Sequence, residues 1–187
     1  MSTAFSIGQM NQLGDALELA GFTPDEVTKL RNFPRLKDFR SVINGHSQIV
    51  SVKHVIDCDA NPYVPNGLEV ESHKKDGQFE WDPKKVKFYL SEYQQGDKYI
   101  EGNKLRKELE NKPVLNANVL DYLLKHPEII PESWKDNVIF FWGTVYSYSD
   151  DRLYIRGLCW RGESWYSYYY RLGDNFCPLN PAVVAGK

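Results

Sequence analysis

Three alternating segments in the last third of the chain constrain its fold more than any other feature. Apolar and polar side chains alternate along Val138–Tyr146, Leu153–Trp160 and Trp165–Leu172, as in β-strands with two different faces. Only short polar turns, around Asp150 and Gly162, separate these segments. Because such short connections join antiparallel neighbours, the sequence predicts a C-terminal antiparallel β-meander.

Helical patterns with clear boundary signals occupy the start of the chain. Ser6 can cap an apolar stripe, and "TPDE" at Thr23–Glu26 combines an N-cap threonine, an N1 proline and a glutamate three residues after the cap. A third helix is expected over Leu36–Ile43, with a glycine just beyond it. We therefore predict a trihelical module over residues 1–47 and a second domain over residues 48–187.

The middle of the chain mixes short strands with helices. Turn residues divide it into short pieces, of which Gln48–Ile56 and Val86–Leu90 have the composition of strands. Asn103 and Asn116 are predicted to cap two helices that end before prolines. The expected class is α+β, with an N-terminal three-helix module followed by short strands, two helices and the C-terminal antiparallel β-meander.

Composition narrows the kinds of partner. A net charge of −2 argues against a cationic face for nucleic acid or for an acidic membrane, and the sequence shows neither a signal peptide nor a membrane span. The three cysteines lack CxxC spacing and are odd in number, so they favour a reducing cytoplasm over a disulfide framework. Dispersed histidines and the lack of a glycine-rich phosphate loop lead us to predict no metal and no cofactor.

One stretch, "DCDAN" at Asp57–Asn61, suggests catalysis. Its oxygen ligands alternate as at the start of a calcium loop, and Asp57 and Asp59 suggest a small metal-dependent hydrolase or nuclease. A calcium loop, however, needs glycine and glutamate where this chain has Pro62 and Leu68. A turn stabilised by Asp and Asn side chains explains the same stretch, so we assign no catalytic residue and keep the enzyme as an alternative.

Aromatic side chains are concentrated in the predicted meander. Val138–Leu172 contains three of the five tryptophans and seven of the twelve tyrosines. Rigid aromatic rings supply contact area at low entropic cost, although packing across strands is an alternative explanation for them. We predict a ligand-binding face that consists of Tyr154, Arg156, Trp160, Trp165, Tyr166, Tyr168, Tyr170 and Arg171.

In this interpretation the other face of the sheet is core. It would pack on the helices through Ile139, Phe141, Val145, Ile155 and Cys159. The favoured function is a non-catalytic module that binds a protein or a glycan through ring stacking and charge-assisted hydrogen bonds. The alternatives are the enzyme that uses Asp57 and Asp59, and a structural or assembly subunit that oligomerises through its helices or its aromatic face.

Three stretches and the end of the chain carry a resemblance. They read "KHVIDCDANPYVPNG", "GNKLRKELENKPVLNANVLDYLLKHPEIIPESWK" and "VIFFWGTVY", with "NPA" at Asn180–Ala182. These stretches are similar to an uncharacterised family of bacterial proteins with an aromatic tail, and the similarity covers most of the chain from Lys53 onward. Because no activity is known for that family, the resemblance implies no functional residue.

Overall fold

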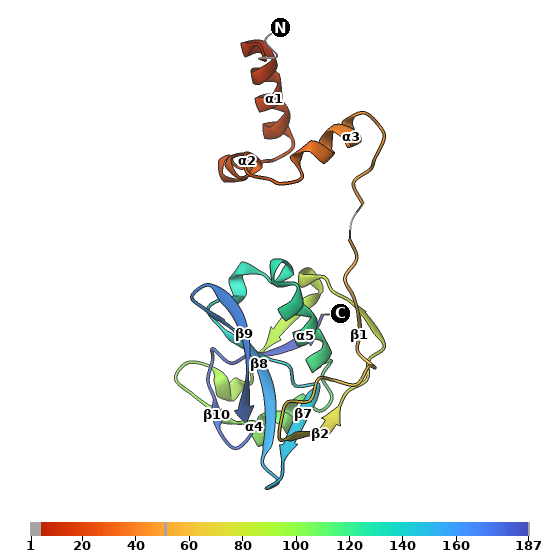
Figure 1. Ribbon diagram of the computed structural model, residues 1–187. Coiled ribbons are helices and arrows are strands. Elements are labelled where there is room, and N and C mark those ends of the chain that lie inside the picture. The colour runs from red at the N-terminus through yellow and green to blue at the C-terminus, as the bar shows by residue number, and fades with distance from the viewer. Residues whose placement is uncertain (1–4, 51, 187) are drawn as a thin grey trace. The chain divides into compact units, whose positions relative to one another are not determined.

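The contacts within the chain divide it into two units, Met1–Val52 and Lys53–Lys187. The structure is a computed structural model that describes residues 5–50 and 52–186 (Figure 1). The described part of the first unit is helical, and the second combines helices with sheets, so the predicted α+β class is confirmed. Among the residues described, no helix is long and apolar enough to cross a membrane.

Short helices make up the first unit, and the predicted caps fix where two of them begin. The elements are α1 (Ile7–Leu19), α2 (Pro24–Leu30), the 3-10 turn η1 (Leu36–Asp38) and α3 (Phe39–Ile43). Both capping boxes form: the hydroxyls of Ser6 and Thr23 accept the N–H groups of Gln9 and Glu26, at 3.2 and 3.3 Å. No described residue of this unit is fully buried, so its apolar side chains are partly open to solvent.

A seven-stranded sheet forms the centre of the second unit. The strands are β2 (Leu68–His73), β4 (Val86–Tyr89), β6 (Val138–Phe140), β7 (Thr144–Tyr148), β8 (Leu153–Arg161), β9 (Ser164–Arg171) and β11 (Ala182–Ala185). Their order is β2-β7-β8-β6-β11-β4, and β9 pairs with β8 outside this path. All pairs are antiparallel except β6 with β11, which is parallel.

Smaller elements surround this sheet. Two short sheets pair β1 (Val55–Asp57) with β3 (Gln78–Glu80), and β5 (Ile100–Glu101) with β10 (Asn175–Phe176). The helices are α4 (Gly102–Leu109) and α5 (Ala117–Lys125). Single 3-10 turns are η2 (Pro83–Lys85), η3 (Glu92–Gln94), η4 (Pro127–Ile129) and η5 (Glu132–Trp134). In Figure 1, α5 lies beside β1, whereas α4 lies near β10.

The two helices pack on opposite faces of the large sheet. Leu120 of α5 belongs to one buried cluster with Phe141 and Leu158, and Leu105 of α4 belongs to another with Phe140. Phe140 and Phe141 are adjacent in an extended segment, so their side chains point to opposite faces. The sheet therefore has a hydrophobic core on each side.

Three predicted elements differ from the structure. Of the predicted strand Gln48–Ile56, only the last two residues are paired, in β1. Ser51 lies outside the described residues. The composition of a strand alone does not provide a partner strand for the rest. The helix predicted to begin after a cap at Asn103 begins at Gly102, with Glu101 at the N-cap position and no capping hydrogen bond from its side chain. Predicted strand Val138–Tyr146 is broken after β6, because β6 pairs with β11 on its outer side whereas β7 pairs with β2.

Candidate binding surface on the β8–β9 hairpin

The eight predicted binding residues lie on two faces of one hairpin. β8 and β9 pair in a continuous register, from Tyr154 opposite Arg171 to Arg161 opposite Ser164. Directly opposite residues of an antiparallel pair share a face. The face toward α5 carries Tyr154, Arg156, Trp160, Trp165 and Arg171, and the face toward α4 carries Tyr166, Tyr168 and Tyr170.

The predicted core face is divided in the same way. Ile139 and Phe141 pack in the cluster of α5, whereas Val145 and Ile155 pack in the cluster of α4. Cys159 is buried opposite Tyr166, on the face of α4. The prediction of one core face behind one binding face is therefore wrong. Helices cover both sides of the sheet, and the break between β6 and β7 interrupts the alternation of side chains.

Two of the three tyrosines on the α4 face are part of the core margin. The ring of Tyr170 lies 4.9 Å from that of Phe176, centroid to centroid, and its hydroxyl donates to the C=O of Asn175 at 3.1 Å. Tyr168 packs against Phe140, and burial raises the pKa of Tyr168 to about 12. Tyr166 is different, because 51% of its surface is exposed.

On the α5 face, Arg156 is buried and forms an internal ion pair. Its Nη2 lies 2.7 Å from Oδ1 of Asp121, and its Nε donates to Oγ of Ser167 at 3.2 Å. Burial acts to lower the pKa of Arg156, but Asp121 and the Tyr146 hydroxyl hold that pKa above its ordinary value. Arg156 therefore lies beneath the surface of the hairpin and stabilises it through internal contacts.

Two exposed tyrosines lie around this ion pair, and the predicted set includes neither. The guanidinium of Arg156 lies 5.5 Å from the ring centroid of Tyr63, whose own C=O accepts the buried hydroxyl of Tyr146 at 3.1 Å. Tyr169 is directly opposite Arg156 on β9 and is 38% exposed. Tyr63 follows a turn and gave no signal in the sequence, whereas Tyr169 was excluded because the prediction favoured the tyrosines of the other face.

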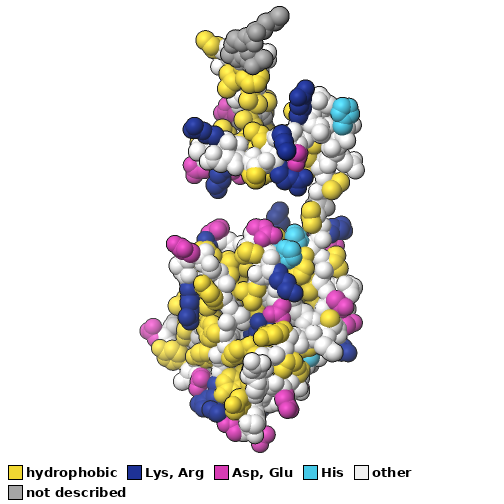
Figure 2. Space-filling view, viewed as in Figure 1, with side chains coloured by type: hydrophobic (Ala, Val, Ile, Leu, Met, Phe, Trp, Pro, Cys, Tyr) yellow, Lys and Arg dark blue, Asp and Glu magenta, His cyan; other side chains and the backbone are white. Residues whose placement is uncertain are grey.

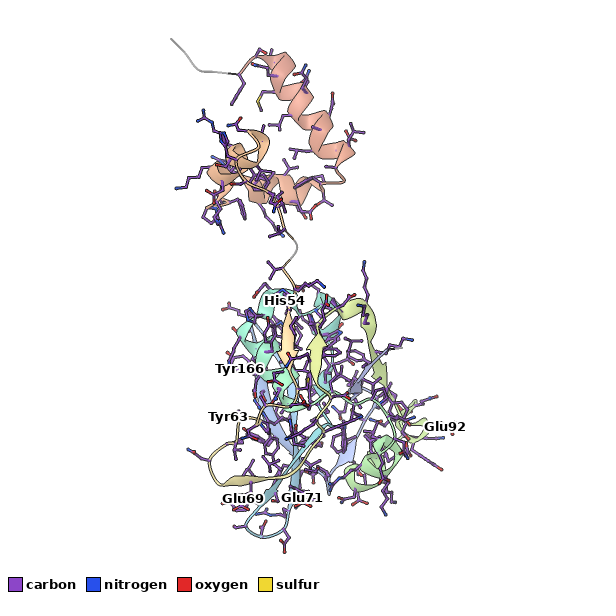
Figure 3. All side chains as sticks on the ribbon, turned by 90° about the vertical axis from the view of Figure 1, so that its right-hand side faces the viewer. His54, Tyr63, Glu69, Glu71, Glu92 and Tyr166 are labelled. Atoms are coloured by element: carbon purple, nitrogen blue, oxygen red, sulfur yellow. The ribbon has the colours of Figure 1, made fainter. Side chains whose placement is uncertain are left out.

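A groove of about 400 Å³ lies between β1 and α5 beside Tyr63. Its lining combines two aromatic rings with amide and carboxylate groups, from Tyr63, Tyr122, Asn61, Asn118, Asp57 and Asp121. In Figure 3, Tyr63 and Tyr166 reach the same side of the second unit, and Glu92 lies at the opposite side. Rings with a few polar groups are the usual lining of a ligand site.

A pair of tryptophans occupies the turn end of the hairpin. Trp160 and Trp165 are directly opposite, with ring centroids 5.4 Å apart, and Nζ of Lys135 lies 3.9 Å from the centroid of Trp160. Both rings line a second groove of about 390 Å³. At the other end of the hairpin, Arg171 is exposed and pairs with Asp174 at 3.1 Å.

β9 is an edge strand of the sheet. Within the described chain it pairs with β8 alone. The N–H of Leu172 donates to the C=O of Leu153, next to the last pair of the ladder, so the main-chain groups of Tyr168 and Tyr170 also face β8. Those of Trp165, Ser167 and Tyr169 then point away from the sheet. Figure 2 shows hydrophobic side chains over much of the area of β8 and β9.

The acidic stretch Asp57–Asn61 forms a turn that its own aspartate side chains stabilise, as the non-catalytic interpretation predicts. Oδ1 of Asp57 accepts the N–H of Asp59 at 3.0 Å, and Oδ1 of Asp59 accepts the N–H of Gly77 at 2.9 Å. The nearby His54 pairs with the hydroxyl of Tyr122, at 3.0 Å, through its Nδ1. Within residues 5–50 and 52–186, no three His, Cys, Asp or Glu side chains are grouped so that they could hold a metal ion.

A polar cluster of buried Cys58, Asn116 and Thr144 with half-buried His73 has the residue types of a thiol-dependent active site but not its chemistry. Nδ1 of His73 pairs with Oγ1 of Thr144 at 2.8 Å, and its Nε2 with the C=O of Cys58 at 3.1 Å. Burial, followed by the charges of nearby aspartates, raises the pKa of Cys58 to about 11, whereas a nucleophilic thiol needs a lowered pKa.

The cluster connects segments that are far apart in the sequence. Nδ2 of Asn116 donates to the C=O groups of Cys58 and Lys74, each at 2.9 Å, and Oγ1 of Thr144 accepts the N–H of Ala117 at 3.0 Å. The loop after β1, the end of β2, the cap of α5 and β7 are thereby fixed to one another. We interpret the cluster as structural.

Comparison with known protein families, with curated proteins and with solved structures finds no match. The resemblance to a bacterial family with an aromatic tail therefore stays a prediction.

Proposed function

We propose that the protein is a non-catalytic binding module that recognises a protein partner along the β8–β9 hairpin. In this proposal, an extended segment of the partner adds to β9 as a further strand of the sheet. Main-chain hydrogen bonds then provide affinity, and grooves beside the strand select side chains. The proposal keeps the aromatic hairpin of the sequence prediction but moves the contact from one sheet face to the free edge.

The observation that carries this proposal is the difference between β9 and the other two edges of the sheet. Natural edge strands are protected from pairing by charge, by bulges or by being short. β2 carries the exposed side chains of Glu69 and Glu71 and an irregular register beside them (Figure 3). β4 has four residues, one of which is Lys87.

β9 has none of these protections. It has eight residues, its register with β8 is continuous, and its sequence "SWYSYYYR" contains no proline and only one charge, Arg171, at its end. Its outward main-chain groups belong to Trp165, Ser167 and Tyr169. Such an edge is a template for pairing, and its retention in a folded chain favours a partner that uses it.

Side chains next to this edge offer contacts for both faces of an added strand. On the α5 face, the groove at Trp165 and the exposed ring of Tyr169 lie beside β9. On the α4 face, Tyr166 is exposed. Because side chains of an added strand alternate between faces, one partner segment can contact both sets.

A glycan is the second candidate, because the groove beside Tyr63 combines rings with amide and carboxylate groups. In that case aromatic stacking and side-chain hydrogen bonds provide the affinity, and the main chain of β9 does not take part. The two candidates therefore predict different consequences when a main-chain N–H of β9 is removed.

The test compares two substitutions at Tyr169. Tyr169→Ser removes the ring and keeps the outward N–H, whereas Tyr169→Pro removes both, at an edge position where proline is tolerated in strands. Peptides selected from a random displayed library on the immobilised wild-type protein are the probes. We expect Tyr169→Ser to weaken their binding partly and Tyr169→Pro to abolish it.

Circular dichroism is the control that both variants keep the fold. Equal peptide binding by two folded variants would contradict strand addition, and so would a selection that enriches no peptide over a blank surface. Binding to members of a glycan array, equal in Tyr169→Ser and Tyr169→Pro, would favour the groove at Tyr63 instead. Concentration-dependent dimerisation that Tyr169→Pro abolishes would identify a second copy of the chain as the added strand, in line with an assembly subunit.

A further inference from the structure

A cleft on another side of the second unit has the features of an anion site. It has a volume of about 880 Å³ and lies between the end of β2, helix α4 and the break between β6 and β7. This volume is in the range of small-molecule sites in proteins. It shares no lining residue with the two grooves beside the hairpin.

Three cations line this cleft, with one carboxylate. They are Lys74, Arg106 and Lys107, and the carboxylate is that of Glu110. The cleft is thus positive in a chain whose net charge is −2. None of the three cations forms an ion pair with another described residue, although seven other Lys and Arg side chains do.

Neutral groups hold two of these cations in place. Nζ of Lys74 donates to the C=O of Lys112 at 2.9 Å, and Nη2 of Arg106 donates to Oγ of Ser72 at 3.3 Å. Because neutral acceptors orient the cations without cancelling their charge, both keep the capacity to meet an anion. Arg and Lys side chains are the usual hydrogen-bond donors to phosphate groups in proteins, and this cleft contains one Arg and two Lys.

The floor of the cleft is apolar and includes an aromatic ring. Leu109, Val145 and Trp142 contribute to the lining, and Trp142 is 5% exposed. Its Nε1 is buried and has no hydrogen-bond acceptor among the described residues. Because Nε1 is itself buried, the part of the indole that lines the cleft is its apolar ring surface.

We propose that this cleft binds a small phosphorylated molecule with a flat apolar part. The phosphate meets Arg106, Lys107 and Lys74, and the apolar part lies on the floor beside Trp142. The site is independent of strand addition at β9.

Phenyl phosphate, inorganic phosphate and phenol are the probes, because they separate the ring from the anion. Binding is followed by the shifts of main-chain amide and indole N–H signals in two-dimensional NMR, with Trp142→Phe to assign the Trp142 indole. We expect phenyl phosphate to bind more tightly than either part, and to shift the Trp142 indole and the amides of residues 106 and 107.

The matched variants are Arg106→Ala/Lys107→Ala, which removes two cleft cations, and Lys104→Ala, which removes a cation of α4 outside the cleft lining. The double variant should bind phenyl phosphate about ten-fold or more weakly, as expected for the loss of charge-assisted hydrogen bonds, and Lys104→Ala should bind as the wild type does. Equal loss in both variants would overturn the proposal. So would the lack of saturable shifts with every probe at roughly 10 mM, the weak limit of specific binding.

Discussion

In the buried pair of Arg156 and Asp121, removal of the Asp121 carboxylate should destabilise the protein more than removal of the Arg156 charge. The Arg156 side chain is 5% exposed and the Asp121 side chain 22% exposed, at an N–O distance of 2.7 Å. Asp121→Ala leaves a buried cation without its counter-charge, which typically costs about 3–5 kcal/mol. We expect the lower end, about 3 kcal/mol, because Ser167 Oγ still accepts from Arg156 Nε.

Arg156→Met should cost much less. Methionine keeps most of the apolar volume, and the Asp121 side chain that remains is partly exposed. Replacement of a buried charge by an apolar side chain is often near neutral, so we expect a loss below about 1.5 kcal/mol, which includes the lost contact with Tyr63.

The double variant Asp121→Ala/Arg156→Met decides whether this reasoning holds. Since it removes the cation that Asp121→Ala leaves unpaired, it should be more stable than Asp121→Ala alone. The assay is urea unfolding followed by circular dichroism, with the free energy of unfolding compared among the four proteins. Equal losses in the two single variants, with additive losses in the double variant, would refute the claim that burial of the Arg156 charge dominates.

Three further predictions concern the tyrosines and the modularity of the chain. Tyr166→Ser should change the free energy of unfolding by less than about 0.5 kcal/mol, whereas Tyr170→Ser, at the core margin, should cost roughly 2 kcal/mol; urea titrations compare them. Folding raises the pKa of Tyr168 from 10.0 to about 12, so the unfolded chain loses this proton first. Stability should therefore fall as the pH rises from 10 to 12, and less so in Tyr168→Phe, as measured by urea midpoints against pH. A fragment of residues 53–187 should fold alone and show a cooperative thermal transition by circular dichroism; a gradual, non-cooperative melt would contradict this.

Local signals explain why several elements were predictable from the sequence. The capping boxes at Ser6 and Thr23 and the cap at Asn116 act within a few residues, so they can be read without knowledge of the fold. The β8–β9 hairpin was predictable for the same reason, because its turn at Gly162 joins two alternating segments. In each case the partner groups are near neighbours in the chain.

Long-range pairing explains what the sequence did not show. Strand β11 pairs with β6 in parallel and with β4, and neither partner is near it in the chain. The role of Arg156 depends on Asp121 of α5, so alternation could place Arg156 on a face but could not show that a helix buries it. Because helices cover both sides of the sheet, Tyr168 and Tyr170 lie at the margin of the core on the α4 side, which alternation alone could not show.

Hydrogen exchange at the main-chain amides of β9 tests most directly whether this edge is free and receives a partner strand. In the free protein, the amides of Ser167 and Tyr169 should exchange nearly as fast as unprotected amides, whereas those of Tyr168 and Tyr170, which face β8, should be protected. Addition of a library-selected peptide should then protect Ser167 and Tyr169. Protection of these two amides in the free protein, or no gain of protection with the peptide bound, would contradict the account.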